Sequence, residues 1–410
     1  MKVLIVSTHD RLGGAAIAAY RLLEALNKND VEASMFVLNK KSTNPNVIQV
    51  GNNLMNKVSF VVERFDIFIK NGFTKKKLFD ISIANTGVSI VHHPEFKQAD
   101  IIHLHWINQG MLSIKEIGEI IATGKKIVWT MHDMWPFTGI CHHAGTCNHF
   151  EKDCGFCPYL KSPSQRDMSY STYQRKLTAY SKGKIHFVAC SNWLKDLAIK
   201  SPLTSNHEVS SIPNPINTTT YRPKDKTSFR KLMNLPIDKK IILFVAAKVS
   251  DKRKGIDYLI EASKTLAKQE SNFMFLIVGS NGEEISSKLA LPAKIANYVA
   301  QEEMPNIYNV ADVFVTPSLQ ENLPNTIMES MSCGTPCIGF NIGGIPEMID
   351  HKQNGYIAKY KDAQDLANGI RWILNEADTA LISENARQKA ETNYSESYIA
   401  KKYLAIYNQD

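Results

Sequence analysis

One stretch constrains the fold of this chain more than any other: DVFVTPSLQENLPNTIMESMSCGTPCIGFNIGGIPEMID, residues 312–350. The apolar run 313–315 is typical of a strand buried on both faces of a parallel sheet. The proline and asparagine at 324–325 suit a helix start, and Gly334 ends that helix before a second apolar run at 337–340. The stretch predicts a βαβ unit, whose loops lie at the edge of a sheet where ligands of such folds bind.

Two carboxylates in this stretch are candidates for ligand binding. Glu321 lies in the predicted loop and Glu329 in the predicted helix, with seven residues between them. A helical rise of about 1.5 Å per residue puts such a pair roughly 10 Å apart, which suits a ligand with hydroxyls at both ends of a diphosphate. The turn at Gly343 and Gly344 can offer backbone N–H groups to the phosphates. Two separately solvated glutamates are the alternative.

The segment 317–349 resembles the donor-site signature of the family-4 retaining glycosyltransferases, and the similarity covers nearly the whole chain. The resemblance implies an α/β protein of the GT-B fold, with two doubly wound Rossmann-like domains facing across a cleft. It also implies that Glu321 faces the transferred sugar and that Glu329 holds the nucleotide ribose. Asn325, Gly343 and Gly344 would belong to the same donor site.

Length and composition agree with a two-domain globular protein. The 410 residues are 44% hydrophobic and 21% charged. We expect a first domain at 1–205, completed by the last helix at 392–410, and a donor-binding domain at 206–391. The polar run 201–220 is predicted to link them. The last helices are expected near 363–375 and 396–407, and the final one crosses back in proteins of the GT-B fold.

Charge and hydropathy set the expected environment. The net charge of +8 fits an anionic ligand or an anionic membrane surface, and no nucleic-acid recognition motif is present. The apolar run 3–6 is too short for a signal peptide, and no run of about 18 apolar residues exists. These features predict a cytoplasmic protein, in solution or peripheral on the cytoplasmic face of the inner membrane.

Residues 54–77 combine an apolar repeat with basic residues. Leu54, Val58, Val61, Phe65 and Phe68 recur at helical spacing, and lysines and an arginine lie between and after them. An apolar stripe of this kind either packs against the core or lies on an anionic membrane.

Histidines lie on one predicted strand of the first domain and directly after the next. His103 and His105 alternate onto one face of the strand 100–106, where a structural role is the alternative to function. The next strand, 126–131, leads into His132. In the resembled family a histidine at this position lies beside the transferred sugar, and the loop carrying Gly13–Gly14 lies near the diphosphate and the acceptor.

Four cysteines follow His132 within seventeen residues: Cys141, Cys147, Cys154 and Cys157. Their number suits a tetrahedral structural zinc, although the spacing is not that of a standard finger. Reduced or paired thiols in a loop are the alternative. Similar cysteine-bearing insertions occur in transferases of bacterial surface-polysaccharide assembly that resemble those of colanic acid and capsule synthesis.

A basic loop, KVSDKRKG at 248–255, follows the buried strand 241–246. Bases at a sheet edge suit a diphosphate, whose negative charge grows as it leaves. The resembled family uses an arginine and then a lysine before glycine. Lys254 matches that lysine, whereas Lys248 occupies the arginine position and Arg253 is a possible substitute. Because no Asp-x-Asp motif is present, these bases are expected to replace a catalytic metal, and no catalytic cofactor is expected.

The predicted function is therefore transfer of a sugar by a hexosyltransferase-type enzyme, with retention, from a UDP- or GDP-sugar. The acceptor is a hydroxyl of a glycan or lipid-linked oligosaccharide in bacterial surface-polysaccharide synthesis. The expected catalytic residues are Glu321, His132 and Lys254. A nucleotide-sugar epimerase of the same fold, or a non-catalytic nucleotide-sugar-binding protein, is the alternative.

Overall fold

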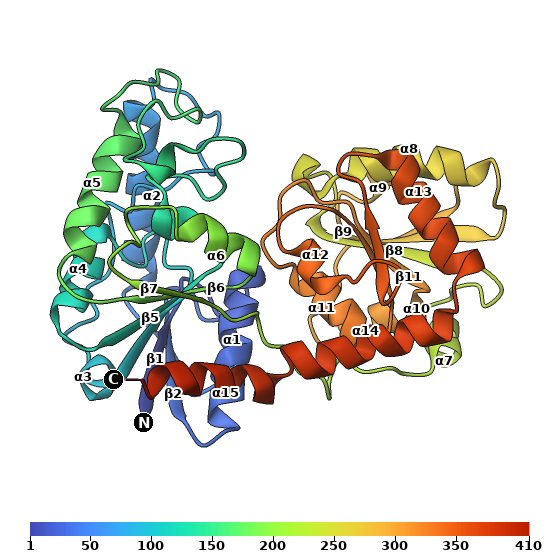
Figure 1. Ribbon diagram of the computed structural model, residues 1–410, viewed down its shortest axis with the longest axis horizontal. Helices are drawn as coiled ribbons and strands as arrows, with labels where there is room; N and C mark the ends of the chain where they lie inside the picture. The colour runs from blue at the N-terminus through green and yellow to red at the C-terminus, as the bar shows by residue number, and fades with distance from the viewer. Residues whose placement is uncertain (410) are drawn as a thin grey trace. The chain divides into compact units, whose positions relative to one another are not determined.

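The computed structural model describes residues 1–409, without the side chains of residues 53 and 55. The chain forms two compact units (Figure 1). Unit 1 comprises Met1–Pro215 together with the residues from Ile399 onward, and unit 2 comprises Ile216–Tyr398. The last helix, α15, therefore begins at the end of unit 2 and continues in unit 1.

Unit 1 is built on a parallel sheet of seven strands in the order β3-β2-β1-β4-β5-β6-β7. The strands are β1 (Lys2–Val6), β2 (Glu32–Val37), β3 (Val47–Gln49), β4 (Ile101–Leu104), β5 (Lys126–Met131), β6 (His186–Ala189) and β7 (Glu208–Ser211). The strand order reverses between β1 and β4, so the loops after these strands lie at the switch point where doubly wound sheets bind ligands.

Helices cover both faces of this sheet. They are α1 (Gly14–Asn27), α2 (Asn53–Lys70), α3 (Pro94–Gln98), α4 (Ile114–Ala122), α5 (Met168–Tyr180), α6 (Asn192–Ala198) and α15 (Glu396–Tyr407), with 3-10 turns η1 (Trp135–Phe137) and η2 (His149–Glu151). Alternation along β1 explains the two layers: Val3 and Ile5 pack with α1 and α15, whereas Leu4 and Val6 pack with α4 and α5.

Unit 2 is built on a second parallel sheet, of six strands in the order β10-β9-β8-β11-β12-β13. The strands are β8 (Lys240–Lys248), β9 (Phe273–Ser280), β10 (Ala293–Ala296), β11 (Val313–Thr316), β12 (Cys337–Phe340) and β13 (Gly355–Ala358). Its order reverses between β8 and β11, so the loops after these two strands form the second switch point.

The helices of unit 2 alternate with its strands. They are α7 (Lys226–Leu232), α8 (Ile256–Ala267), α9 (Glu283–Ser286), α10 (Met304–Val310), α11 (Asn325–Ser332), α12 (Ile345–Met348), α13 (Ala363–Arg371) and α14 (Thr379–Tyr394), with a 3-10 turn η3 (Lys252–Lys254) and a π-turn η4 (Trp372–Glu376). The apolar runs of β8, β9, β11 and β12 are buried, as expected for strands covered on both faces.

The two doubly wound Rossmann-like domains predicted from the sequence are confirmed, and β11, α11 and β12 form the predicted βαβ unit. Two expectations were wrong. The polar run 201–220 is not all linker, because it contains the edge strand β7, whose half-exposed residues look polar in the sequence. A further helix, α14, lies between the two final helices that were expected.

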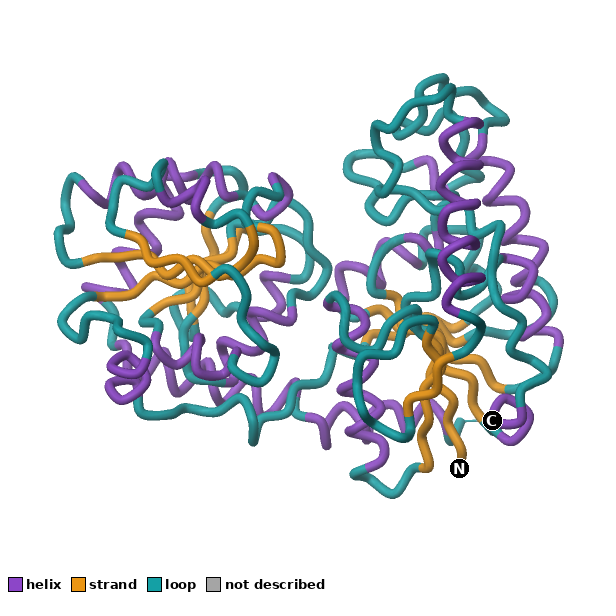
Figure 2. The backbone as a smooth tube through the Cα atoms, turned by 180° about the vertical axis from the view of Figure 1, so that it is seen from behind, coloured by secondary structure: helices purple, strands orange, loops and turns teal. Residues whose placement is uncertain are grey.

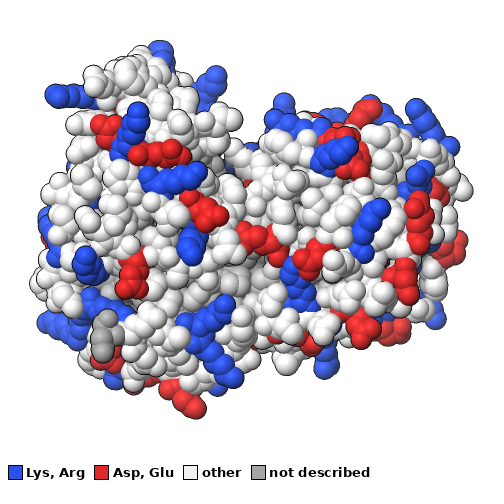
Figure 3. All heavy atoms as spheres, viewed as in Figure 1, with Lys and Arg blue, Asp and Glu red and all other residues white. Residues whose placement is uncertain are grey.

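Two surface properties follow from the fold. On the face shown in Figure 3, basic and acidic side chains are interspersed over each unit. Among residues 1–409, every helix is too short or too polar to cross a membrane.

Candidate active site

Three loops of unit 2 interlock at the switch point of its sheet. They follow β8, β11 and β12. The amide of Leu319 donates to Arg253 O at 2.7 Å, which joins the first loop to the second. The amide of Gly344 donates to Asn322 O at 2.8 Å, which joins the second to the third. Residues from three separate parts of the sequence are therefore held together at one edge of the sheet.

Glycine is required where these loops approach one another. Gly255 and Gly343 have positive φ values of 71° and 58°. A Cβ atom on Gly255 would lie 1.7 Å from Pro317 O, and one on Gly343 would lie 1.8 Å from Glu321 O. Any side chain at either position would force the loops apart. The close approach of the loops, which these glycines permit, therefore fixes the positions of Lys254 and Glu321.

The interlocked loops bring two predicted catalytic residues into contact. Lys254 Nζ forms an ion pair with Glu321 Oε1, and the Ser318 hydroxyl donates to the same oxygen at 3.1 Å. The Glu321 side chain is only 14% exposed, against 36% for Lys254. The pair places a cation and a hydrogen-bond acceptor side by side in a partly enclosed position, where charges interact more strongly than in open water.

Glu329, the second predicted carboxylate, lies on α11 and is buried. Its Oε2 accepts a hydrogen bond of 2.7 Å from the hydroxyl of Tyr308, which lies on α10. Burial and the neighbouring Glu329 raise the pKa of Tyr308, so the phenol keeps its proton and acts as the donor. The tyrosine was not predicted as a site residue, because nothing in its own sequence surroundings marks it.

The other predicted donor-site residues have mixed surroundings. Lys248 is exposed at the end of β8. Arg253 forms a bidentate ion pair with Asp251, with the closest contact at 2.8 Å. Asn325 begins α11 and is half-buried. The N–H of Gly344, which was expected to contact a phosphate, instead donates to Asn322 O.

The predicted glycine loop of unit 1 lies at the switch point of its own sheet. Gly13, with φ 89° and ψ 161°, caps α1, and Gly14 is the first residue of that helix. The loop after β1 is tied to the loop after β4, because the Thr8 hydroxyl donates to Asn108 O at 2.7 Å. These positions agree with a backbone that a ligand can approach closely.

His132 follows β5 at the same edge and belongs to a chain of histidines. Its Nε2 lies 2.9 Å from His105 Nδ1, and its Nδ1 lies 3.5 Å from Cys190 Sγ. Burial lowers the pKa of His132 to about 4, and burial together with the neighbouring histidines lowers the pKa of His105. Both rings are therefore neutral near pH 7. Nε2 of His105 is buried and has no hydrogen-bond partner among residues 1–409, an unusual cost that functional sites often carry.

His103 has a structural role, which was one of the two interpretations of the sequence. Its ring nitrogens lie 2.6 Å from the hydroxyl of Tyr407 and 2.8 Å from that of Thr130, so it anchors α15 to β5. Burial lowers its pKa to about 3. His105, by contrast, orients His132, and the sequence pattern alone did not separate these two roles.

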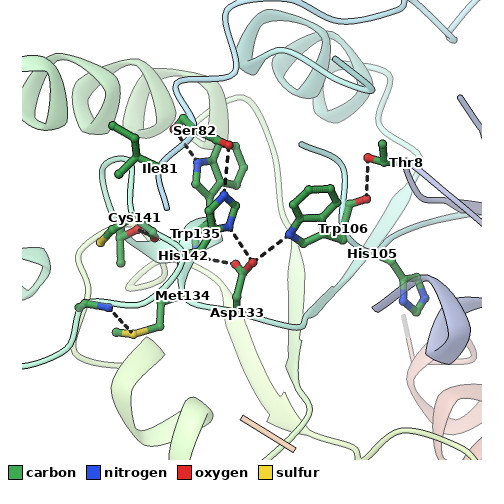
Figure 4. Close-up of polar contacts among 12 residues, drawn as sticks. Thr8, Ile81, Ser82, His105, Trp106, Asp133, Met134, Trp135, Cys141 and His142 are labelled. Carbon is green, nitrogen blue, oxygen red and sulfur yellow. Dashed lines mark hydrogen bonds and ion pairs between the residues drawn. The ribbon is translucent and has the colours of Figure 1, made fainter. Parts of the chain in front are cut away.

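Asp133 connects the segment after His132 to its surroundings (Figure 4). Its carboxylate lies 2.7 Å from His142 Nδ1 and accepts from Trp106 Nε1 at 2.9 Å. Burial alone would raise the pKa of Asp133, but the charge and hydrogen bond of His142 lower it to about 2. Asp133 was not predicted as a site residue, although it directly follows His132.

The four cysteines at 141, 147, 154 and 157 all line one small cavity. All seven cysteines of the chain are free thiols. Burial raises the pKa of Cys154 to about 12 and that of Cys157 to about 11. Within the described chain, no group of three or more His, Cys, Asp or Glu side chains is arranged to hold a metal ion. The structural zinc predicted at these four cysteines stays a prediction.

Comparisons with known proteins agree with this architecture. Residues 12–220 match the family described as Glycosyltransferase Family 4, and residues 225–391 match the family described as Glycosyl transferases group 1. The chain belongs to glycosyltransferase family 4. Sequence relatives support this membership: an uncharacterised glycosyltransferase of Methanocaldococcus jannaschii is 26% identical over 76% of this chain and 83% of its own length.

A further sequence relative matches over a shorter span. N,N'-diacetylbacillosaminyl-diphospho-undecaprenol α-1,3-N-acetylgalactosaminyltransferase of Campylobacter jejuni is 32% identical over 43% of this chain and 46% of its own length. Among solved structures, Anabaena HepE in complex with UDP-glucose has a TM-score of 0.66 at 16% identity, covering 99% of both chains. Sucrose-phosphate synthase from Thermosynechococcus elongatus has a TM-score of 0.66 at 17% identity, covering 100% of this chain and 98% of that chain. At such identities the structures show a shared fold, and the chain is a glycosyltransferase of the GT-B type.

Proposed function

We propose that this chain transfers a hexose, with retention, from a nucleotide sugar to a hydroxyl of a glycan or lipid-linked oligosaccharide in bacterial surface-polysaccharide synthesis. The observation that carries the proposal is the contact between Lys254 and Glu321 at the switch point of the second sheet. A diphosphate-linked sugar requires a cation for its phosphates and an acceptor for its hydroxyls at adjacent positions. The family membership supports the reaction class.

In this proposal Lys254 stabilises the leaving diphosphate. The bond between the sugar carbon and the phosphate oxygen breaks, and negative charge grows on that oxygen. The acceptor oxygen bonds to the same face of the sugar carbon, and its proton passes to the leaving phosphate. Glu321 holds hydroxyls of the transferred sugar, and Lys248 or Arg253 supplies a second positive charge.

Glu329 and His132 complete the proposed set. Glu329 accepts hydrogen bonds from the ribose, and Tyr308 holds its carboxylate in place. His132, neutral near pH 7, exchanges a hydrogen bond with a hydroxyl of the substrate. The backbone at Gly13 and Gly14 approaches the diphosphate or the acceptor. Each role is proposed from resemblance to the family.

The names of the relatives support the substrate class. The Campylobacter relative is named for a lipid-linked diphospho-undecaprenol substrate, and the Anabaena neighbour was solved with UDP-glucose. A UDP-sugar donor and a lipid-linked acceptor are therefore the first substrates to test. An epimerase of the same fold would consume the donor without an acceptor, and a binding protein would release no nucleotide at all.

The test is nucleotide release from UDP- and GDP-sugars with and without lipid-diphosphate sugar acceptors. We expect release that depends on acceptor, and a loss of about 100-fold or more in kcat for Lys254→Ala. Lys252→Ala is the matched control, because Lys252 is an exposed lysine in the same turn. Conversion of the donor into a second nucleotide sugar, without acceptor and without nucleotide release, would favour the epimerase. Equal rates in the two variants would contradict the role of Lys254.

A further inference from the structure

Helix α2 buries an ion pair and exposes an apolar stripe. Glu63 and Arg64 are buried and form an ion pair of 3.0 Å. Glu63 Oε1 accepts from the amides of Ile83 and Ala84, each at 2.9 Å. Surface helices usually bury their large apolar side chains, whereas α2 buries this ion pair beside Ile67 and exposes most of its large apolar side chains.

The outer face of α2 exposes six large apolar side chains. At about 100° per residue they fall within an arc of roughly 100°, so they form one continuous stripe. Each is between 43% and 70% exposed: Leu54, Val58, Val61, Val62, Phe65 and Ile69. The stripe continues after the helix, where Phe73 and Phe79 are 69% and 66% exposed.

This arrangement excludes one of the two sequence interpretations of residues 54–77. Four of the five residues in the predicted stripe face solvent, so the interpretation that they pack against the core is wrong. Seen from behind in Figure 2, α2 runs along the outside of unit 1. Single exposed apolar residues are common, but a contiguous apolar patch on a water-soluble unit is rare and marks a binding surface.

Positive charge flanks the apolar stripe. Lys57 lies on the helix, and Lys75, Lys76 and Lys77 follow it, all exposed. Residues 53–80 contain six basic residues against three acidic ones. Of the acidic residues, Glu63 pairs with Arg64 inside, and Asp66 and Asp80 pair with lysines. The surface that surrounds the stripe is therefore basic.

We propose that α2 and the segment 71–79 form a docking surface for a membrane that contains anionic lipids. An apolar stripe beside lysines is complementary to the boundary between acyl chains and acidic headgroups. The apolar side chains enter the acyl region and the lysines lie among the headgroups. The inference rests on the geometry of α2 alone, so it stands whether or not the acceptor is lipid-linked.

Hydrogen bonds connect this docking surface to the segment after His132. Arg64 donates to Leu78 O and Ile81 O at 2.6 and 2.8 Å, and to the Ser82 hydroxyl at 3.2 Å. The Ser82 hydroxyl lies 3.1 Å from His142 Nε2, and His142 binds Asp133 (Figure 4). Docking of α2 would therefore hold the 133–142 segment at a constant position relative to the membrane surface.

The test is co-sedimentation of the full chain with vesicles of phosphatidylcholine alone, or with about 30% phosphatidylglycerol. We expect binding to the anionic vesicles that weakens as salt rises. Val61→Ser with Phe65→Ser should reduce binding by about tenfold or more, because both side chains leave the acyl region. The control is Ile199→Ser with Leu232→Ser, which changes two other exposed apolar residues. Lys75→Ala with Lys76→Ala should reduce the salt dependence.

Three results would overturn the proposal. They are absence of binding by the parent chain, equal binding by the Val61/Phe65 variant, and a dimer in sedimentation velocity that this variant dissociates without any vesicle binding. The last result would assign the face to a second copy of the chain. Nucleotide-sugar binding should be the same in all variants, so failure of membrane docking is distinguishable from failure of the proposed transferase activity.

Discussion

The hydrogen bond between Tyr308 and Glu329 offers a sharp test of the proposed ribose site. Tyr308→Phe removes only the hydroxyl and keeps the ring, which packs near Tyr221 and Phe314. The lost hydrogen bond is 2.7 Å long and lies in a buried position. A hydrogen bond to a charged group contributes about 1.5–3 kcal/mol. If that energy holds Glu329 in its binding orientation, nucleotide affinity falls by roughly 10- to 150-fold.

The assay is calorimetric titration of UDP, GDP and ADP, with urea unfolding as a separate measure of stability. Glu329→Gln should weaken nucleotide binding as well, because it removes the charge that accepts the ribose hydroxyls. Tyr356→Phe is the matched control: it removes a hydroxyl that donates to Asp365 at 2.9 Å elsewhere in unit 2. The control should lower stability without changing nucleotide affinity. Equal nucleotide affinity in Tyr308→Phe and the parent would refute the reasoning.

Two further predictions concern the buried groups of unit 1. Burial lowers the pKa of His103 from 6.5 to about 3, so below pH 6.5 the unfolded chain takes up a proton that the folded chain rejects. The free energy of unfolding is therefore lower at acid pH, by about 2 kcal/mol at pH 5 from this residue. The urea midpoint should fall when the pH is lowered from 7 to 5. A fall of the same size in His103→Gln would contradict the assignment. If the predicted zinc site exists, elemental analysis should find one equivalent of zinc per purified chain. A metal-free chain whose seven cysteines all titrate as thiols after unfolding would exclude the site.

Much of the fold could be predicted from local pattern. Strands β11 and β12 could be predicted from the apolar runs 313–315 and 337–340. Such runs have no helical period and suit a sheet that is buried on both faces. The helix between them begins at Asn325, directly after a proline that is compatible with a helix start. Edge strand β7 was missed because half of its surface faces water, which removes the apolar signal.

The candidate site was only partly predictable. Lys254 and Glu321 were both identified, but their contact spans 67 positions in the sequence and depends on the order of strands in the sheet. Tyr308 was missed, and the role of His105 was left open, because each acts through a partner: His105 contacts His132, and Tyr308 holds Glu329. A partner that is distant in the chain leaves no trace in local spacing.

Helix α2 shows the division between sequence and tertiary structure clearly. Its apolar repeat, taken alone, predicted a helix within residues 54–77, because the period of the pattern reports the backbone geometry, and the structure has a helix at Asn53–Lys70. The repeat did not determine which side of that helix meets the protein. Only the folded chain decided this, because the amides of Ile83 and Ala84 bind Glu63 and so hold the side with Glu63 and Arg64 inward. Local pattern sets the backbone, whereas the direction of each side chain depends on the groups that the rest of the fold places beside it.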